Sequence, residues 1–441
     1  MLGRLRGLCG ALLACAVVAG VTLGGCSVAV PRWKEGPLAP PSAKEAAPGA
    51  NAFAMSLFGK VRRAGENLVL SPLSMRVVLL MAHAGARGET AAEMAKALGI
   101  SEAEDVHTVA IATLRALAAD NGKGGLALAL ANRLWGHVPT TFHEPFLELL
   151  REGYGAPLER VDLRAPEVAA SRINDWVAEE TKGLIQDLLS PADIGRDTKL
   201  VLTNAVYFKG TWLEPFEEEL TSPSPFYRLD GSTRYVHMMG QTVAQGRYGQ
   251  DEGVDLVELG YFGGSTAMVL AVPRERAGLP ALEAGLTGAV FERWLAALAR
   301  QKVDVRMPRF RLSSRLEMGQ ALRDLGMERA FGSVADFSGM SPEPIWLEAA
   351  LQASFVEVNE VGTEAAAASA LSAGGFGPGV PEPPVPVVVA DRPFLFFIRH
   401  RATGVVLFMG RVTDPCSGNK AACPDGPRPP AEPQPTPDLD E

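Results

Sequence analysis

The sequence predicts an α+β fold with several antiparallel or mixed β-sheets. In the first part of the chain apolar residues recur at helical spacing, and further on short apolar runs typical of strands dominate. The chain has 441 residues, of which 47% are hydrophobic and 21% charged, so it can bury a large core and is not wholly disordered. Its net charge of -9 argues against a nucleic-acid-binding protein, which would need a basic surface.

Residues 1–25 read as an export signal. Arg4 and Arg6 precede an apolar run over 8–23, which is short for a membrane-spanning helix. The run leads into Leu-Gly-Gly-Cys26, which resembles the lipobox of bacterial lipoproteins. That resemblance implies cleavage before Cys26 and acylation of its thiol, so that lipid anchors the protein to the cell envelope. Because Ser27 is not aspartate, we expect the outer membrane. An ordinary export signal, giving an extracellular protein, is the alternative.

Two proline-rich segments flank the globular region expected over 50–415. Residues 26–49 contain prolines without an apolar period, which predicts an extended tether. Residues 416–441 are rich in proline and acid, which predicts a disordered tail. In this tail Cys416 and Cys423 are expected to pair, because an exported chain meets an oxidising compartment. Two free surface thiols are the alternative.

The globular region is predicted to begin with helices. Asn51 can cap the first of them, and Ser71-Pro72 can open a second, because proline suits a first helical turn. A third helix is expected over 89–98, ended by Gly99.

Strands are expected to follow the helices. Each predicted strand is a short run of apolar residues, and the run at 200–208 is interrupted only by Asn204. These runs cover residues 200–208, 254–259, 268–272, 303–307, 353–358 and 394–398.

Motifs of several large enzyme classes are absent from the sequence. It contains no GxSxG, no HExxH, no phosphate-binding GxxxxGK[ST] and no GxGxxG after a strand, and its six histidines are scattered. We therefore expect neither an enzyme nor a metal or other cofactor. A hydrolytic lipoprotein remains a separate class of explanation, which turnover of peptide or ester substrates would establish.

Residues 359–376 are the most informative segment. They read Asn-Glu-Val-Gly-Thr-Glu-Ala-Ala-Ala-Ala-Ser-Ala-Leu-Ser-Ala-Gly-Gly-Phe and lie between a predicted strand and a proline-rich stretch. An alanine run alone is typical of a helix or a flexible linker. Here, however, the segment resembles the hinge of inhibitory serpins. Other stretches resemble further serpin motifs, so that the similarity runs over 51–415; they are 67–74, 85–94, 204–212, 391–394 and 408–412.

The resemblance implies the serpin fold and a suicide inhibitor of extracellular serine proteases, chymotrypsin-like or elastase-like; a cysteine protease is a further possible target. An exposed loop at about 360–386 would be offered as substrate, and the protease nucleophile would form an acyl-enzyme. The cut loop would then insert into the central sheet as a new strand and hold the protease. A non-inhibitory binding or chaperone-like serpin is the alternative. We expect a monomer, and no heparin partner because the region 101–119 is not basic.

The hinge sequence permits such an insertion. Alternate residues of a strand face opposite sides, and the resemblance puts Thr363 and every second residue after it inward. None of these is charged, and Glu364 lies in the outward set, so no unpaired charge would be buried. The implied hinge residues are Glu360, Gly362, Thr363, Glu364, Ala365, Ala366, Ala367, Ala368 and Ser369.

The usual loop length of the family, counted from Glu360, places the scissile bond at Phe376–Gly377. Phenylalanine suits the apolar primary pocket of chymotrypsin-like proteases. The stretch from Phe376 to Pro393 is longer than usual for the family, so Leu371–Ser372 remains a second candidate.

The resemblance also implies two polar sites around the central sheet. The first, the shutter, comprises Ser71, Ser74, Asn204 and Gln352; the family usually has histidine in place of the glutamine, which cannot become charged near neutral pH. The alternative is that these groups merely satisfy one another. At the second, the breach at the end of the sheet, Trp212 is expected, together with an Arg309–Glu360 ion pair. Two solvated charges, worth ~0–1 kcal/mol, are the alternative.

Overall fold

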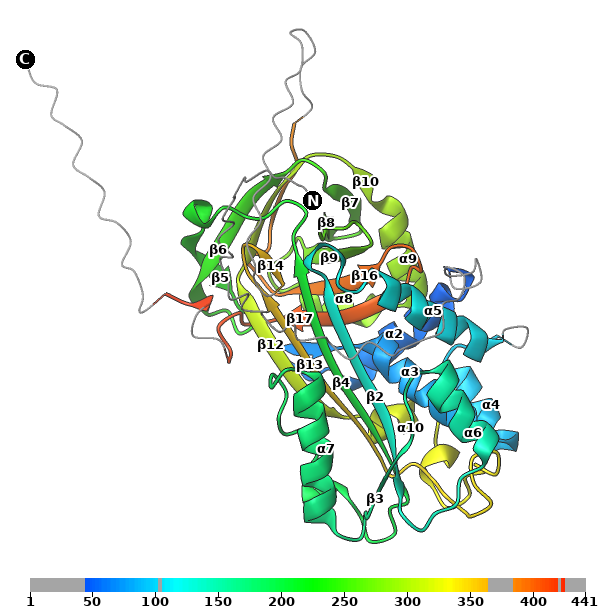
Figure 1. Cartoon of the computed structure of the whole chain (residues 1–441). Coiled ribbons are helices and arrows are strands. Elements are labelled where there is room, and N and C mark those ends of the chain that lie inside the picture. The colour runs from blue at the N-terminus through cyan, green and yellow to red at the C-terminus, as the bar shows by residue number, and fades with distance from the viewer. Residues whose placement is uncertain (1–43, 102–104, 364–383, 419–421, 425–441) are drawn as a thin grey trace, which may run out of the picture.

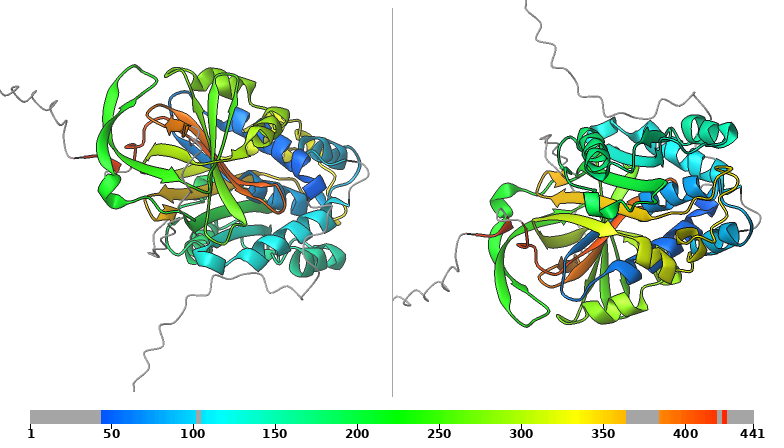
Figure 2. Two further views of the ribbon diagram at one scale, coloured as in Figure 1. Left: turned by 90° about the horizontal axis from the view of Figure 1, so that it is seen from above. Right: turned by 90° about the horizontal axis from the view of Figure 1, so that it is seen from below.

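The computed structural model describes residues 44–101, 105–363, 384–418 and 422–424. In this part of the chain three β-sheets carry the fold, and the helices between residues 47 and 148 gather on one side of it (Figure 1). Views from above and below show the hairpin formed by β5 (Ser222–Tyr227) and β6 (Thr233–Val243) at the side opposite these helices (Figure 2). The α+β class with several antiparallel or mixed sheets expected from the sequence is confirmed.

The central sheet has six strands and contains both parallel and antiparallel neighbours. Its members, in spatial order, are β12 (Phe310–Glu317), β13 (Ala349–Val358), β14 (Gly362–Thr363), β4 (Leu200–Thr211), β2 (Ala127–His137) and β3 (Glu159–Val161).

The other two sheets have seven and four strands. The seven-stranded sheet runs β1 (Leu68–Leu70), β17 (Val406–Val412), β16 (Phe394–His400), β9 (Thr266–Pro273), β8 (Val254–Gly260), β7 (Arg247–Asp251) and β10 (Ala299–Arg300). The four-stranded sheet runs β15 (Val387–Val389), β11 (Val303–Pro308), β6 (Thr233–Val243) and β5 (Ser222–Tyr227).

Helices cover both faces of the central sheet. One face carries α7, whose Ile173 and Val177 are buried with Trp135 and Val201 of the sheet. On the other side α3 packs against β2 and β4 (Figure 1). The α-helices of the described residues are α2 (Ala47–Val61), α3 (Pro72–His83), α4 (Gly88–Ala97), α5 (Val106–Asp120), α6 (Glu144–Glu148), α7 (Pro166–Glu180), α8 (Leu279–Gly285), α9 (Gly288–Ala297) and α10 (Gly319–Asp324). None of the described helices is long and apolar enough to cross a membrane.

The predicted strands are present with small shifts at their ends, and two of the three predicted helix starts agree with the structure. The start at Asn51 was wrong. Helix α2 begins at Ala47, and Asn51 is buried inside it, where its amide donates to Glu292 and to the carbonyl of Gly404. Three residues assigned to the tether, 47–49, are therefore helical. A tertiary contact has overridden the capping preference of asparagine.

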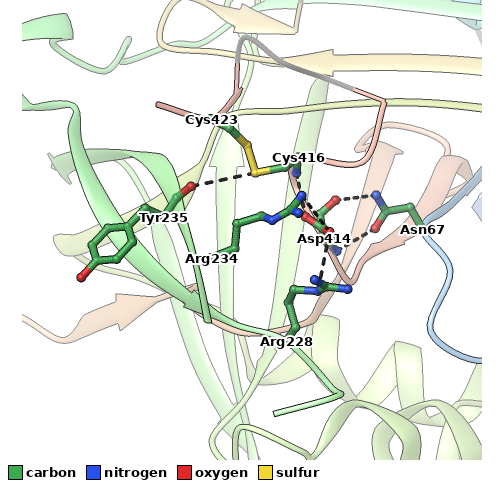
Figure 3. The surroundings of a disulfide bond; sticks show 7 residues. All are labelled: Asn67, Arg228, Arg234, Tyr235, Asp414, Cys416 and Cys423. Carbon is green, nitrogen blue, oxygen red and sulfur yellow. Dashed lines mark hydrogen bonds and ion pairs between the residues drawn. A yellow bond between two sulfur atoms is a disulfide. The ribbon is translucent and has the colours of Figure 1, made fainter. Parts of the chain in front are cut away.

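The chain leaves the last strand through a short disulfide loop. Cys416 and Cys423 are bonded, with 5.8 Å between their Cα atoms. Asn67 fixes the strand end before this loop, since its side chain bonds the backbone of Thr413 and Asp414 (Figure 3). The Asp414 carboxylate lies 3.5 Å from Arg234, so the loop is held against the β5–β6 hairpin.

Candidate functional site

The site is built around a seam in the central sheet. Strands β13 and β4 run parallel and pair directly from Ala349↔Val201 to Phe355↔Tyr207. This line of direct pairing is called the seam below. Beyond its end the two strands diverge, and the two-residue strand β14 lies between them. The β13–β14 connection is the start of the segment that resembles a serpin hinge.

Two hinge residues already belong to the sheet. Thr363 pairs with Val358 of β13 and with Gly210 of β4, and Gly362 pairs with Thr211. A side chain at position 362 would collide with the carbonyl oxygen of Gly210, so the backbones approach closely only because this residue is glycine. The hinge therefore enters the sheet between the two strands that a longer inserted strand would have to separate.

The Thr363 side chain points into the protein. It is fully buried, and its hydroxyl lies 2.7 Å from the hydroxyl of Tyr261. Burial raises the pKa of Tyr261, so its hydroxyl stays protonated and can donate to or accept from threonine. This is the inward face that the alternation of the hinge assigns to Thr363.

Trp212 lies at the end of β4 and holds the turn that precedes the hinge. Its backbone N–H donates to the carbonyl of Val361 at 2.9 Å, and its indole N–H donates to the carbonyl of Asn359 at 3.0 Å. Its ring stacks on Tyr261 at 4.6 Å. The tryptophan expected at this end of the sheet thus contacts the hinge turn directly.

Glu360 and Arg309 are in contact. The Glu360 carboxylate is 3% exposed and accepts from the Arg309 guanidinium at 2.6 Å and from the Thr221 hydroxyl at 2.6 Å. Its backbone carbonyl accepts from the N–H of Phe216. A carboxylate this deeply buried needs these partners, so the pair is not two solvated charges.

Beneath the sheet, Gln352 joins α3 to the seam. Its side-chain oxygen accepts from the N–H of Ser71 at 3.0 Å, and its amide donates to the carbonyl of Ser71 at 2.8 Å. The same amide donates to the Asn204 side-chain oxygen at 2.5 Å, across the seam. Glutamine thus satisfies both a helix terminus and the neighbouring strand without a charge.

Ser71, Ser74 and Asn204 complete the network with a residue that the sequence analysis missed. Asn132 of β2 accepts from the Ser74 hydroxyl at 2.9 Å and from the Asn204 amide. Ser71 caps α3 and donates to the carbonyl of Leu407. Asn132 and Asn204 are in register on neighbouring strands. The sequence feature that could have identified Asn132 is its position as a lone asparagine in an apolar run. Ser71, Ser74, Asn132, Asn204 and Gln352 are called the shutter cluster below.

The shutter cluster and the hinge contacts together connect the strands on both sides of the seam, and these residues contain no nucleophile paired with a base. Four of the five cluster residues are fully buried or nearly so, and Asn132 is 8% exposed. Among the described residues no group of histidine, cysteine, aspartate and glutamate side chains could hold a metal ion.

Several residues assigned from the sequence lie outside the described part of the chain. They are Cys26, the hinge residues Glu364, Ala365, Ala366, Ala367, Ala368 and Ser369, and both candidate scissile bonds, Phe376–Gly377 and Leu371–Ser372. The described part of the chain resumes at residue 384 and includes β15, which pairs parallel to β11.

Comparison with known proteins finds a family match over nearly the whole described range. The model of one family, described as "Serpin (serine protease inhibitor)", matches residues 48–415. A leukocyte elastase inhibitor from Sus scrofa is 39% identical over 376 residues, which cover 82% of this chain and 97% of that protein. Serpin B6 from Macaca fascicularis is 38% identical over 364 residues, 79% of this chain and 94% of the relative.

Solved structures resemble this fold over most of its length. Serpin48 of the insect Tenebrio molitor has a TM-score of 0.74 at 29% identity, covering 84% of this chain and 98% of its own. The thermophilic serpin tengpin, in its native state, has a TM-score of 0.76 at 26% identity, with coverages of 87% and 96%.

Proposed function

Because the chain belongs to the serpin family, we propose that it is a suicide-substrate inhibitor of extracellular serine proteases that works by inserting its own cut loop into the central sheet. One observation carries the proposal: Gly362 and Thr363 already pair between β13 and β4, which supports an insertion that starts there and continues along the seam. The relatives named as leukocyte elastase inhibitors support the inhibitory activity.

In the proposed mechanism the target protease attacks the carbonyl of one loop residue and its nucleophile becomes acylated. Cleavage frees the hinge side of the loop, which continues inward from Thr363. Each inserted residue forms ladder hydrogen bonds worth roughly 1 kcal/mol net. Insertion replaces the direct β13–β4 pairing and must break the Gln352–Asn204 hydrogen bond. The protease is carried with the loop before it deacylates.

We assign the scissile bond to Phe376–Gly377, with Leu371–Ser372 as the second candidate. An apolar residue before the cut suits chymotrypsin-like proteases, and the chain is similar to inhibitors named for elastase. A cysteine protease could be held in the same way, because its thiolate also forms an acyl-enzyme.

We further propose that the protein acts at the cell envelope, at an outer membrane, rather than free in solution. The support is the sequence alone: the apolar leader, the Leu-Gly-Gly-Cys26 motif and the proline-rich stretch that would separate lipid from the domain. Palmitate labelling of the protein in a bacterial host, with Cys26→Ser as control, tests this. Equal labelling of the C26S protein contradicts it.

Incubation with chymotrypsin, elastase, subtilisin and papain, followed by denaturing gels, tests the inhibitory function. We expect a protease–inhibitor band that survives denaturation, with intact-mass spectrometry placing the new C-terminus at Phe376. Complete loop cleavage by every protease without a stable complex would instead indicate the non-inhibitory alternative. Mass spectrometry of the cleaved loop also decides between the two candidate bonds.

A further inference from the structure

A cleft of ≈ 310 Å³ lies beside the seven-stranded sheet and is lined by helices α8 and α9. The turn that joins β7 to β8 and the connection from β9 to α8 complete its walls. By the same measure one water needs ~10–15 Å³, so the cleft has room for about twenty waters or for a small organic molecule. None of the residues that line it belongs to the hinge contacts or to the shutter cluster.

The cleft lies on the side of α9 that faces away from α2. Val290, Arg293 and Trp294 line it, and helical periodicity places these three residues on one side of α9. Glu292 lies on the opposite side, where it accepts a hydrogen bond from Asn51 of α2. The packing of α2 on α9 therefore leaves the cleft uncovered.

One part of the lining is apolar. Leu282 of α8 and Val290 of α9 pack against the protein core but are only partly buried. Pro273 and Trp294, which are buried, contribute further apolar surface. A hydrocarbon group placed against these side chains would be withdrawn from water, and so would the side chains, which contributes roughly 25 cal/mol for each Å² of apolar surface.

The charged part of the lining is acidic. It contains the carboxylates of Asp251, Glu252 and Glu275 and one cation, Arg293. Asp251 already has partners, since it accepts from Arg293 at 2.8 Å and from the indole N–H of Trp294 at 2.9 Å. The hydrogen bond from Arg293 lowers the pKa of Asp251, which keeps this carboxylate charged. Arg293 also attracts Glu252, but a single cation cannot balance three carboxylates.

The two arginines beside Glu275 are engaged elsewhere. Arg274 pairs with Asp255 at 3.3 Å. Arg276 lies over the ring of Tyr227, 3.4 Å from the ring centroid. Neither arginine lines the cleft, and Glu275 has no ion pair with any residue that the structure describes. The connection from β9 to α8 thus directs its negative charge, and not its positive charges, to the cleft.

The acids are arranged for an extended ligand and not for a bare metal ion. In the part of the chain that the structure describes, no cluster of histidine, cysteine, aspartate and glutamate could hold a metal. Glu252 and Glu275 lie on two different connections, next to the backbone hydrogen bond that Arg274 donates to Gly253 at 2.8 Å. A cation carried on an apolar body can lie between these two connections and against the apolar lining at once.

We propose that this cleft binds a small organic cation, namely a primary ammonium group attached to a bulky saturated hydrocarbon. The ammonium group donates to the carboxylates of Glu252 and Glu275, and the hydrocarbon lies against Leu282 and Val290. The match rests on the excess of negative charge, on the apolar lining and on the volume of the cleft. It does not depend on the proposed inhibition of proteases.

Isothermal titration calorimetry on the full-length protein at pH 7 tests the binding, with 4-cyclohexylbutylamine as the probe and 4-cyclohexylbutan-1-ol as its uncharged control. We expect the amine to bind about ten-fold or more tightly than the alcohol, because only the ammonium group forms charge-assisted hydrogen bonds with the carboxylates. Equal affinity for the two ligands, or no heat from the amine at millimolar concentration, overturns the proposal.

The salt dependence of the two affinities tests the role of charge. Raising NaCl from about 0.05 M to about 0.5 M should weaken amine binding about three-fold or more, since salt screens exposed charges, and should leave the alcohol unchanged. An amine affinity that does not respond to salt contradicts recognition by the carboxylates.

A matched pair of charge variants locates the ammonium group. Glu275→Gln should weaken amine binding about five-fold and leave alcohol binding unchanged, because glutamine keeps the size of the side chain and removes its charge. Glu167→Gln, at an exposed position of α7 outside the cleft, should keep amine binding within about two-fold. Equal losses in the two variants, or full amine binding by E275Q, overturn the assignment.

A second pair locates the hydrocarbon. Gly285 lines the cleft at the end of α8, and a side chain there would meet nothing within 4 Å, so Gly285→Phe should fill the cleft and abolish binding of both ligands. Gly59 of α2 has equally open surroundings outside the cleft, and Gly59→Phe should bind both ligands as the unmodified protein does. Full binding by G285F places the ligand elsewhere and overturns the proposal. Should G285F fail to fold, the comparison of E275Q with E167Q still decides.

Discussion

The amide of Gln352 on β13 donates to the side-chain oxygen of Asn204 on β4 at 2.5 Å, across the two strands that an inserted loop must separate. The same side chain makes two hydrogen bonds to the backbone of Ser71, at the start of α3. One neutral residue therefore connects the helix beneath the sheet to both sides of the seam.

Gln352→Ala should destabilise the intact protein by about 2–4 kcal/mol, because it leaves buried polar groups of Ser71 and Asn204 without partners. Thermal unfolding of the intact protein measures this. The exposed Gln320→Ala, which loses only a hydrogen bond to Asp324, is the matched control and should change stability by less than about 0.5 kcal/mol. Equal effects of the two substitutions would show that the shutter cluster does not hold the seam.

Arg309→Gln should lower the free energy of unfolding by about 1–3 kcal/mol. The substitution leaves the Glu360 carboxylate, which is 3% exposed, with only the Thr221 hydroxyl as partner and no cation. The loss is reduced because Arg309 is itself partly exposed. Arg311→Gln is the control. Its partner Glu357 lies 3.8 Å away and is 35% exposed, so the loss there should be within about 0.5 kcal/mol. Denaturant titration of both variants checks the difference. A larger loss in R311Q would contradict the assignment of Glu360 as a buried, paired charge.

Thr363→Arg should convert the proposed inhibitor into a substrate. An arginine cannot replace a fully buried threonine whose hydroxyl contacts Tyr261, so the hinge would be expelled from the sheet. Cleavage by chymotrypsin should continue while the covalent band on denaturing gels disappears. Thr363→Ser keeps the hydroxyl and should keep the complex. Undiminished complex formation by T363R would show that insertion does not start at Thr363.

Acid should destabilise the protein through His107. Its ring lies against His83 and its Nδ1 is 2.7 Å from the Tyr154 hydroxyl; burial, with His83 nearby, lowers its pKa to about 4. The unfolded chain, with a pKa near 6.5, binds the proton first, so stability present above about pH 6.5 is lost as the pH falls toward 4. The loss should reach roughly 3 kcal/mol at most.

Denaturant titrations between pH 7 and pH 4 measure this slope, and His107→Gln should reduce it, because glutamine keeps a polar group beside Tyr154 without titrating. An unchanged slope in H107Q would assign the acid sensitivity to other groups.

Much of the fold was predictable from local sequence. Ser71-Pro72 marks a helix start by its capping hydroxyl and its proline, and apolar runs such as 200–208 mark buried strands. The helix start predicted at Asn51 was wrong because its side-chain amide donates to Glu292 and to the carbonyl of Gly404. These contacts join residues far apart in the sequence, so no local pattern predicts them. Pro48, in the first turn of α2, was the better signal.

The candidate site was predictable only where motifs carry it. Ser74, Asn204, Trp212 and Glu360 lie in segments that resemble family motifs, but Asn132, Thr221 and Tyr261 reach the site through strand register and chain reversals. Register between strands far apart in sequence depends on packing of the whole sheet, which local periodicity does not encode. The position of β14 between β13 and β4 likewise depends on the tertiary structure.

The melting temperature of the loop-cleaved protein, compared with the intact one, tests the central claim most directly. Chymotrypsin should cut the loop at Phe376–Gly377, and a fully inserted strand would extend β14 along the seam and add ladder hydrogen bonds. The account predicts that the cleaved form melts well above the intact form. A cleaved form that melts at or below the temperature of the intact protein would contradict it.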